Sequence, residues 1–223
     1  MSGYEILLNH GVTRLCHFTK LQTLCHIVSN EQGILATNEI SWDTKNVTDP
    51  NRYDGKMNCV CYSIQYPNSW YLLKAQSRDQ DEIFREWTII YIDPSILLHR
   101  KALFSPCNAG TAHGNYINDN INELDSVFDF RVSGWNHTRS PMMLPNCPTN
   151  GQAELLIQDN IPRSLIFGIA VSNTDMAARI SAMLKTVDQT RIKIYIAPDL
   201  FSKVWSEKAR AGIVPIEEEF TIN

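Results

Sequence analysis

Residues 83–92, with the sequence IFREWTIIYI, form the clearest strand pattern in the chain. The apolar and β-branched residues of this run are typical of a buried strand. The Asp93-Pro94 pair ends the run, because proline cannot donate a hydrogen bond to a neighbouring strand. Residues 94–98, PSILL, then predict a single helical turn.

Other strands and short helices are expected on both sides of this run. Strand patterns occur at residues 12–18, 59–64, 153–157, 166–171 and 192–196, and helical patterns occur at 20–29, 70–75 and 175–186. Thr19 is expected to cap the first helix and Gly33 to close it. The elements mix without a regular βαβ rhythm, which predicts an α+β fold rather than a doubly wound α/β fold.

Two polar segments predict long loops. Residues 43–57 are rich in Asp, Asn, Pro and Gly, and residues 104–152 hold many Asn, Gly, Ser and Pro residues. A loop region as long as the second is usually functional or mobile in a compact domain. The last eight residues, IEEEFTIN, are expected to be a solvated end.

The composition is that of a globular protein. Of the 223 residues, 43% are hydrophobic and 20% are charged, which excludes the disordered, collagen-like and coiled-coil classes. A chain of this length buries a sufficient core without staples, and we expect one domain over residues 1–223. The formal net charge of −4 and the pI of about 5.9 do not indicate a strongly basic nucleic-acid binder. A local basic or aromatic patch is compatible with both values.

The cysteines and the chain start bear on metal binding and location. The six Cys residues form no C-x-x-C pair, and no His has convincing ligand spacing, so no metal site is predicted. Residues 1–11 lack the layout of a signal peptide. No apolar run approaches the roughly 18 residues of a membrane span. We therefore expect a cytoplasmic protein with reduced cysteines and no membrane contact.

Three residues could carry chemistry, although the common nucleotide-binding and hydrolase fingerprints are absent. His17, near a strand end, could hydrogen-bond a ligand at the mouth of the next helix. Arg52 could hold a pyrophosphate, because its planar guanidinium matches phosphate oxygens. Glu154 is an acid among apolar neighbours after a long loop. The alternatives are a half-buried histidine bonded to the backbone, a solvated arginine and an ordinary surface glutamate.

An aromatic group could stack on a base or on nicotinamide. Its members are Tyr62, Tyr66, Trp70 and Tyr71. The alternative is that these side chains pack in the core, as buried aromatic side chains commonly do.

Six segments carry a family resemblance over most of residues 12–171. They are RLCHFTKLQTLCHIV, NRYDG, CYSIQYPNSWYLLKA, FREWTIIYIDPSILL, ALFSPCNAG and QAELLIQDNIP. Together they resemble the DarT family of bacterial DNA ADP-ribosyltransferase toxins. The pairing of an early H-F-T with a late Q-A-E strand is the most specific part. CYSIQYPNSWY departs from the V-P-F-Y-F pattern of the thymidine-modifying branch and looks closer to the guanosine-modifying branch.

The resemblance implies an ADP-ribosyltransferase fold of two packed, mainly antiparallel sheets with an NAD cleft between them. It implies NAD as the donor, a base of single-stranded DNA as the acceptor, and a DarG-like macrodomain antitoxin as a partner. The implied catalytic residues are Glu154 and Arg52. The implied NAD contacts come from His17, Thr19, Tyr62, Tyr71 and Asn108. Residues 107–152 would contain the substrate-recognition loop.

The chemistry of such a transfer asks for these residue types. Cleavage of the nicotinamide–ribose bond builds positive charge at the anomeric carbon, as in glycoside cleavage. A carboxylate such as that of Glu154 stabilises this charge and can take a proton from the acceptor base. Stacking and a few cations, such as Lys74, Arg131 and Arg139, would hold the DNA strand. The alternatives are an RNA or protein ADP-ribosyltransferase, an NAD glycohydrolase, and a binding domain without catalysis.

Overall fold

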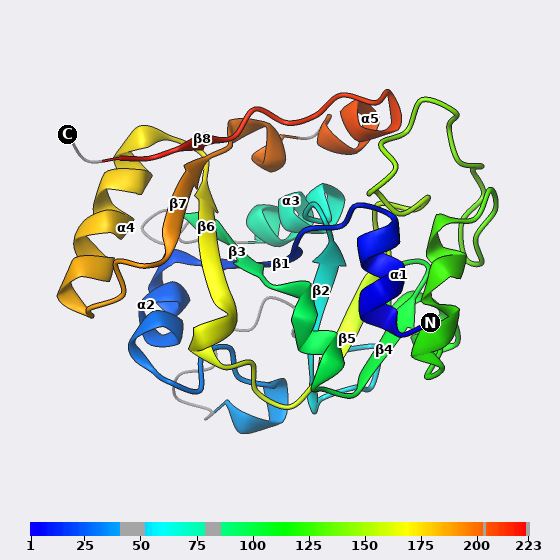
Figure 1. Cartoon of the computed structure of the whole chain (residues 1–223), viewed down its shortest axis with the longest axis horizontal. Helices are drawn as coiled ribbons and strands as arrows, with labels where there is room; N and C mark the ends of the chain where they lie inside the picture. Colours follow the sequence, from blue (N-terminus) through cyan, green and yellow to red (C-terminus); the bar gives the residue numbers. More distant parts are fainter. Residues whose placement is uncertain (41–51, 79–85, 203, 222–223) are drawn as a thin grey trace.

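One mixed sheet runs through the protein and carries helices on both faces (Figure 1). The computed structural model describes residues 1–40, 52–78, 86–202 and 204–221. The strands are β1 (Leu15–Lys20), β2 (Cys59–Ile64), β3 (Trp87–Ile92), β4 (Ala102–Ser105), β5 (Glu154–Gln158), β6 (Ile166–Val171), β7 (Lys193–Ile196) and β8 (Glu218–Glu219). The helices are α1 (Gly3–Asn9), α2 (Leu21–Ser29), α3 (Ser69–Arg78), α4 (Thr174–Thr186) and α5 (Trp205–Arg210).

The described strands follow the order β4-β5-β2-β1-β3-β6-β7-β8. Neighbouring strands are antiparallel, and only β6 and β7 form a parallel pair within the described residues. This mostly antiparallel sheet with short helices confirms the predicted α+β class.

The sheet divides between β1 and β2. β1 pairs with β3 along its whole length, but with β2 only at Leu15 and Cys16. From His17 onward the two strands separate. The expectation of two separate sheets is wrong in one respect. At Leu15 and Cys16, the β1 backbone is paired with β2 on one edge and with β3 on the other. The two halves of the sheet are joined there and part beyond it.

The central strand β3 is buried along its entire length, as its sequence predicts. Ile90 and Ile92 pack in the core on the side of α1, α2 and α4. Ile89 and Tyr91 pack in a second core on the side of α3 and α5. Because both faces are covered, the strand shows no alternation of apolar and polar residues.

The first helix differs from its prediction at both ends. Thr19 lies inside β1 and does not cap α2, whose N-cap residue is Lys20. The helix ends at Ser29, so Gly33 lies beyond it. Gly33 instead has a φ of 66° and packs on the Ile161 backbone. A Cβ at this position would lie 2.3 Å from the Ile161 carbonyl oxygen, so no larger residue fits.

The long polar region before β5 is irregular, as predicted, but it also contains regular elements. β4 ends within it, and a 3₁₀ helix at Ile121–Phe128 buries Leu124, Val127 and Phe128. The loop predicted at 43–57 lies partly outside the described residues. Within the described part of the chain, no helix is long and apolar enough to cross a membrane.

The described end of the chain is ordered along the edge of the sheet, and most of its side chains are exposed, as the prediction of a solvated end requires. β8 pairs with β7. Glu217 accepts hydrogen bonds from Arg14 and from Tyr91 Oη, the latter at 2.8 Å. The side chains of Arg14 and Glu217 expose only 11% and 16% of their surface. The Arg14 guanidinium lies over the Tyr91 ring. Because an unpaired buried cation is costly, Glu217 stabilises Arg14 in this position.

Candidate active site

A cavity of about 350 Å³ lies where β1 and β2 separate. Its wall is formed by β1, β2, α2, the start of α3, the start of β5 and the loop after β4. The residues that were expected to be catalytic or to contact NAD all line it, namely His17, Thr19, Arg52, Tyr62, Tyr71, Asn108 and Glu154. The fold therefore brings together positions that lie far apart in the sequence.

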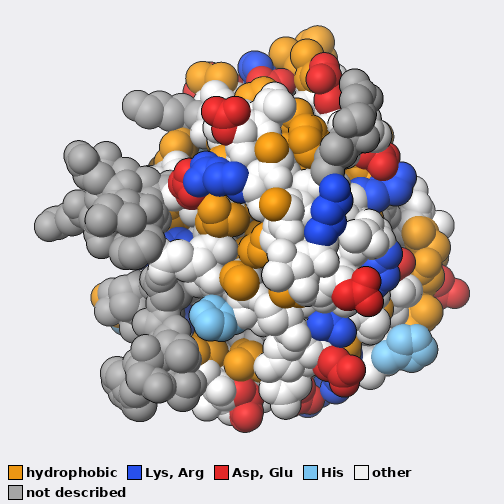
Figure 2. Space-filling model, turned by 90° about the vertical axis from the view of Figure 1, so that its left-hand side faces the viewer, with side chains coloured by type: hydrophobic (Ala, Val, Ile, Leu, Met, Phe, Trp, Pro, Cys, Tyr) orange, Lys and Arg blue, Asp and Glu red, His pale blue; other side chains and the backbone are white. Residues whose placement is uncertain are grey.

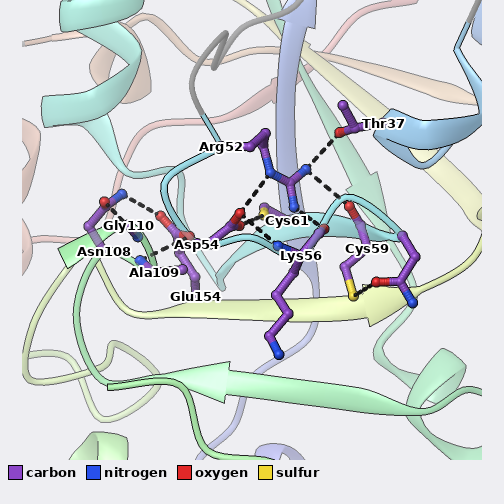
Figure 3. Close-up of polar contacts among 11 residues, drawn as sticks. Thr37, Arg52, Asp54, Lys56, Cys59, Cys61, Asn108, Ala109, Gly110 and Glu154 are labelled. Atoms are coloured by element: carbon purple, nitrogen blue, oxygen red, sulfur yellow. Dashed lines mark hydrogen bonds and ion pairs between the residues drawn. The ribbon is translucent and has the colours of Figure 1, made fainter. Parts of the chain in front are cut away.

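Glu154 is the first residue of β5, and the strands on both sides fix its backbone. It is paired with Ser63 of β2 and with Ser105 of β4. Its carboxylate accepts a hydrogen bond of 2.8 Å from Asn108 Nδ2 and a longer one of 3.4 Å from the Ala109 backbone N–H (Figure 3). The side chain is half-buried, so Glu154 is not an ordinary surface glutamate.

Arg52 is also held by the protein. Its side chain exposes 10% of its surface, so it is not a solvated loop arginine. The guanidinium donates to Asp54 Oδ1 at 3.0 Å, to Thr37 Oγ1 at 2.7 Å, and to the carbonyl oxygens of Cys59 and Lys56 (Figure 3). These bonds connect the segment before β2 to Thr37 and keep a positive charge at the cavity wall.

His17 has a defined tautomer. Its Nδ1 lies 3.0 Å from the carbonyl oxygen of Cys61, across the separation between β1 and β2. Because a carbonyl oxygen only accepts, Nδ1 carries the hydrogen and Nε2 is left as an acceptor. Burial lowers the pKa of His17, and the nearby Arg52 charge lowers it further. A neutral imidazole therefore faces the cavity at neutral pH.

The other predicted NAD contacts differ in exposure. Thr19 is 4% exposed, and its carbonyl oxygen accepts a hydrogen bond of 3.3 Å from Thr88 Oγ1. Tyr62 is 1% exposed and packs in the core, and its hydroxyl has no hydrogen-bond partner among the described residues. The core alternative therefore holds for Tyr62. Tyr71 is half-buried, with its ring centroid 6.2 Å from that of Phe18.

The cations expected to hold DNA do not all face solvent. Arg139 donates to the carbonyl oxygens of Cys147 at 2.8 Å and Leu144 at 3.0 Å. Because buried carbonyl groups need donors, Arg139 fastens the loop before β5, and its role as a DNA contact stays a prediction. Lys74 and Arg131 are exposed.

Sequence reasoning missed two residues of this site. Asp54 is 8% exposed, lines the cavity and forms an ion pair with Arg52. Asn68 also lines the cavity, and its Oδ1 accepts a hydrogen bond of 3.0 Å from the Tyr71 N–H. Its own N–H donates to Ser63 Oγ at 2.9 Å. The available signals were the RYD sequence for Asp54 and the helix-capping preference of asparagine for Asn68.

The cysteines at the cavity are poor nucleophiles. Burial raises the pKa of the Cys16 thiol to about 12 and that of Cys61 well above its ordinary value, so both stay protonated at neutral pH. Among the residues whose placement is described, no three His, Cys, Asp or Glu side chains lie close enough together to hold a metal ion. The groups available for chemistry include the Glu154 carboxylate, the His17 imidazole and the Arg52–Asp54 ion pair.

Comparison with solved structures identifies the fold. Thermus sp. 2.9 DarT in complex with ADP-ribosylated ssDNA has a TM-score of 0.64 and 17% identity, over 86% of this chain and 97% of that chain. The same protein in complex with NAD+ has a TM-score of 0.61 and 19% identity, over 85% and 98%. Thermosipho africanus DarTG in complex with ADP-ribose has a TM-score of 0.58 and 16% identity, over 85% of this chain and 51% of that one.

These similarities place the protein in the class of DarT-like ADP-ribosyltransferase folds. A family model described as "ssDNA thymidine ADP-ribosyltransferase, DarT" matches residues 16–202, which is most of the sequence. The chain belongs to the DarT family. No curated protein matches the sequence.

Proposed function

We propose that this protein transfers ADP-ribose from NAD to a base of single-stranded DNA. The observation that carries the proposal is the meeting of His17, Arg52 and Glu154 in one cavity of a DarT-family fold. DarT of Thermus sp. 2.9 has been solved with NAD+, with carba-NAD+ and with ADP-ribosylated ssDNA. Both substrates of the proposed reaction therefore have precedent in proteins of the same fold.

The cavity suits a dinucleotide in size and chemistry. Its volume of about 350 Å³ is within the range of ligand pockets. The wall offers the Arg52 charge for a diphosphate and polar groups such as His17 Nε2 and Thr19 for ribose hydroxyls. The apolar side chains Ile27 and Leu35 line the part of the cavity formed by α2 and the segment after it, where a flat ring could lie.

Glu154 acts on the ribose next to nicotinamide. When the nicotinamide–ribose bond breaks, nicotinamide leaves with the electron pair and the anomeric carbon becomes positively charged. The Glu154 carboxylate stabilises that charge more than it stabilises the ground state. A nitrogen of the acceptor base then bonds to the carbon, and Glu154 takes the proton that this nitrogen loses. Asn108 keeps the carboxylate in position for both steps.

Arg52 and His17 orient the donor. The hydrogen bonds of Arg52 to Thr37 and Asp54 fix its guanidinium at the wall, where the positive charge attracts the diphosphate. His17 stays neutral and accepts a hydrogen bond from a ribose hydroxyl through Nε2. Fixing the donor in this way contributes through orientation rather than through bond making.

Guanine is the acceptor base that we favour. The supporting observation is the segment 61–71, CYSIQYPNSWY, which departs from the pattern of the thymidine-modifying branch. The matching family model is described by its action on thymidine, so thymine is the alternative.

We further propose that the protein is the toxin of a toxin–antitoxin pair and acts in the cytoplasm, where NAD and DNA occur together. A DarG-like macrodomain antitoxin would remove the ADP-ribose. Family membership and the similarity to Thermosipho africanus DarTG support this role. Expression of the protein alone should stop growth, and co-expression of a DarG-type macrodomain should restore it.

The test of the activity uses purified protein, NAD and oligonucleotides that differ in a single central base. Single-stranded DNA, duplex DNA and RNA of the same sequence are compared by intact mass. We expect one ADP-ribose to be added to single-stranded DNA that contains guanine, because an unpaired base needs little unstacking to reach the cavity. Preferential labelling of RNA would contradict the choice of DNA, and release of nicotinamide without any labelled strand would indicate a glycohydrolase.

A further inference from the structure

Aromatic and cationic side chains form one row on α3. The row consists of Trp70, Tyr71, Lys74 and Arg78, which we call the α3 row. Residues 70, 74 and 78 are spaced by four positions and therefore share one helix face. Lys74 Nζ lies 5.0 Å from the centre of the Trp70 ring, and the Arg78 guanidinium lies 5.7 Å from that of Tyr71. Within its described residues, 69–78, the helix carries no acidic side chain.

The row faces solvent because the opposite side of α3 is buried. Leu72 and Ala75 pack in the core that also contains Trp205 of α5. Trp70, in contrast, exposes 54% of its surface, and Lys74 and Arg78 are exposed as well. A solvent-exposed tryptophan with a lysine 5.0 Å from its ring offers an unpaired base a stacking surface and a nearby cation.

Two hydrogen bonds attach the start of α3 to the strand position next to Glu154. Ser63 is the β2 residue paired with Glu154, and its hydroxyl accepts a hydrogen bond from Asn68. Asn68 in turn caps α3 by accepting from the Tyr71 N–H. Both Asn68 and Tyr71 line the cavity. The α3 row therefore begins at the end of the cavity where Glu154 lies, and continues away from it over the surface.

The face of the molecule that carries α2 and α4 has a different character. Among the described side chains that Figure 2 shows on that face, positive and negative ones are interspersed. The α3 row, in contrast, combines two cations with two aromatic rings. A phosphate backbone with unpaired bases is complementary to such a row, because cations neutralise phosphates and every base has a face that stacks on an aromatic ring.

We propose that the α3 row binds the nucleotides that flank the modified base, with Trp70 stacked on a neighbouring base and Lys74 and Arg78 at its phosphates. This inference rests on the proposed function, because it places the acceptor strand of that same reaction. It accounts for a preference for unpaired strands, since only an unstacked base can lie on Trp70. It requires little sequence specificity at the flanking position, because stacking tolerates every base.

The test compares four variants with the wild-type protein in transfer to a guanine-containing single strand. Trp70→Ala is expected to raise the KM for the oligonucleotide about tenfold, with a smaller change in kcat, because the stacking contact is lost. Trp70→Phe keeps a ring and should recover most of the affinity. Lys74→Ala should reduce the salt dependence of strand binding by about 0.7 in the log–log slope, the value for one phosphate contact on a single strand. Lys185→Ala, at an exposed position of α4, is the charge control.

The outcomes separate the two proposals. If the wild-type protein labels the strand and Trp70→Ala has an unchanged KM and Lys74→Ala an unchanged salt slope, the α3 row does not bind the acceptor and the proposed activity stands. If Lys185→Ala changes the salt slope as much as Lys74→Ala does, the slope reflects the overall charge of the protein and not a contact at α3. The inference is then also overturned. If the wild-type protein labels no strand at all, the proposed function itself fails.

Discussion

The side-chain amide of Asn108 donates a hydrogen bond to the carboxylate of Glu154, with 2.8 Å between Nδ2 and Oε1. The other end of the amide is also used, because Asn108 Oδ1 accepts from the Gly110 N–H at 3.2 Å. The amide is thus fixed with its donor toward the carboxylate. Asn108 is in this arrangement a positioning residue, which holds the Glu154 carboxylate in place.

Asn108→Asp should change the pH dependence of the reaction. The substitution puts a second carboxylate beside Glu154, and like charges at this distance disfavour the ionised form. We expect kcat near pH 7 to fall about tenfold and the acid limb of the pH–rate profile to shift to higher pH. Asn108→Ala should lower kcat without this shift. Identical profiles for the two variants would show that charge repulsion at Glu154 is not the cause.

Arg52→Ala should lower both the stability of the fold and the rate of the reaction. Arg52 and Asp54 form an ion pair whose side chains expose 10% and 5% of their surface. Removal of the arginine leaves a buried carboxylate unpaired, which costs about 3 kcal/mol in the free energy of unfolding. The double variant Arg52→Ala/Asp54→Asn should recover part of this loss, because the unpaired charge is gone. Urea unfolding of Arg52→Ala, Asp54→Asn and the double variant measures the cycle, and strictly additive losses would contradict the coupling.

His17 should make stability depend on pH. Because burial lowers its pKa in the folded protein, the unfolded chain binds the proton first as the pH falls. The contribution of neutral His17 is complete above the unfolded pKa of about 6.5 and is lost as the pH falls through the folded pKa. His17→Gln keeps a donor for the Cys61 carbonyl but does not titrate. Between about pH 7.5 and 5.5, the Tm of the wild-type protein should therefore fall more than that of the variant. Parallel curves would rule out His17 as the group responsible.

Glu217→Ala should be far more damaging than the neighbouring Glu218→Ala. Glu217 is the partner of Arg14 and accepts from Tyr91 Oη, whereas Glu218 is exposed. Loss of Glu217 leaves the buried guanidinium unpaired, which we expect to cost about 3 kcal/mol, against less than about 0.5 kcal/mol for the surface control. Thermal and urea unfolding of the two variants measure the difference. Equal effects would mean that the C-terminal segment is not held through Arg14.

Local sequence patterns predicted the strands and helices that bury one or both of their faces. The apolar run that becomes β3 is buried on both faces, and the periodicity of residues 175–186 becomes α4. Thr19 shows where such reasoning fails. A threonine before a helical pattern resembles a cap, but pairing with Thr88 of β3 places it in a strand. That pairing is between residues far apart in the sequence, so no local signal reveals it.

The members of the candidate site were predicted from the sequence, but the contacts that hold them in the protein were not. His17, Arg52 and Glu154 do share a cavity, which the order of the strands determines. The partners of Arg52 and Arg139 within the protein could not be predicted from the sequence. In the structure, Arg52 donates to Asp54 and Thr37, and Arg139 donates to loop carbonyls. The sequence indicates the charge of a residue. The orientation of its side chain depends on which buried hydrogen-bond acceptors the fold brings near it.

The most direct test of the central claim, that Glu154 drives transfer of ADP-ribose from NAD to single-stranded DNA, is an intact-mass measurement on wild-type protein and Glu154→Gln. Glutamine can still accept the hydrogen bond from Asn108, so the fold should persist, as circular dichroism would verify. It carries no negative charge and is a poor proton acceptor, so the rate should fall by at least about a hundredfold. We expect the strand to gain the mass of one ADP-ribose with the wild-type protein and to stay unmodified with the variant. Equal labelling of the strand by both proteins would contradict the claim.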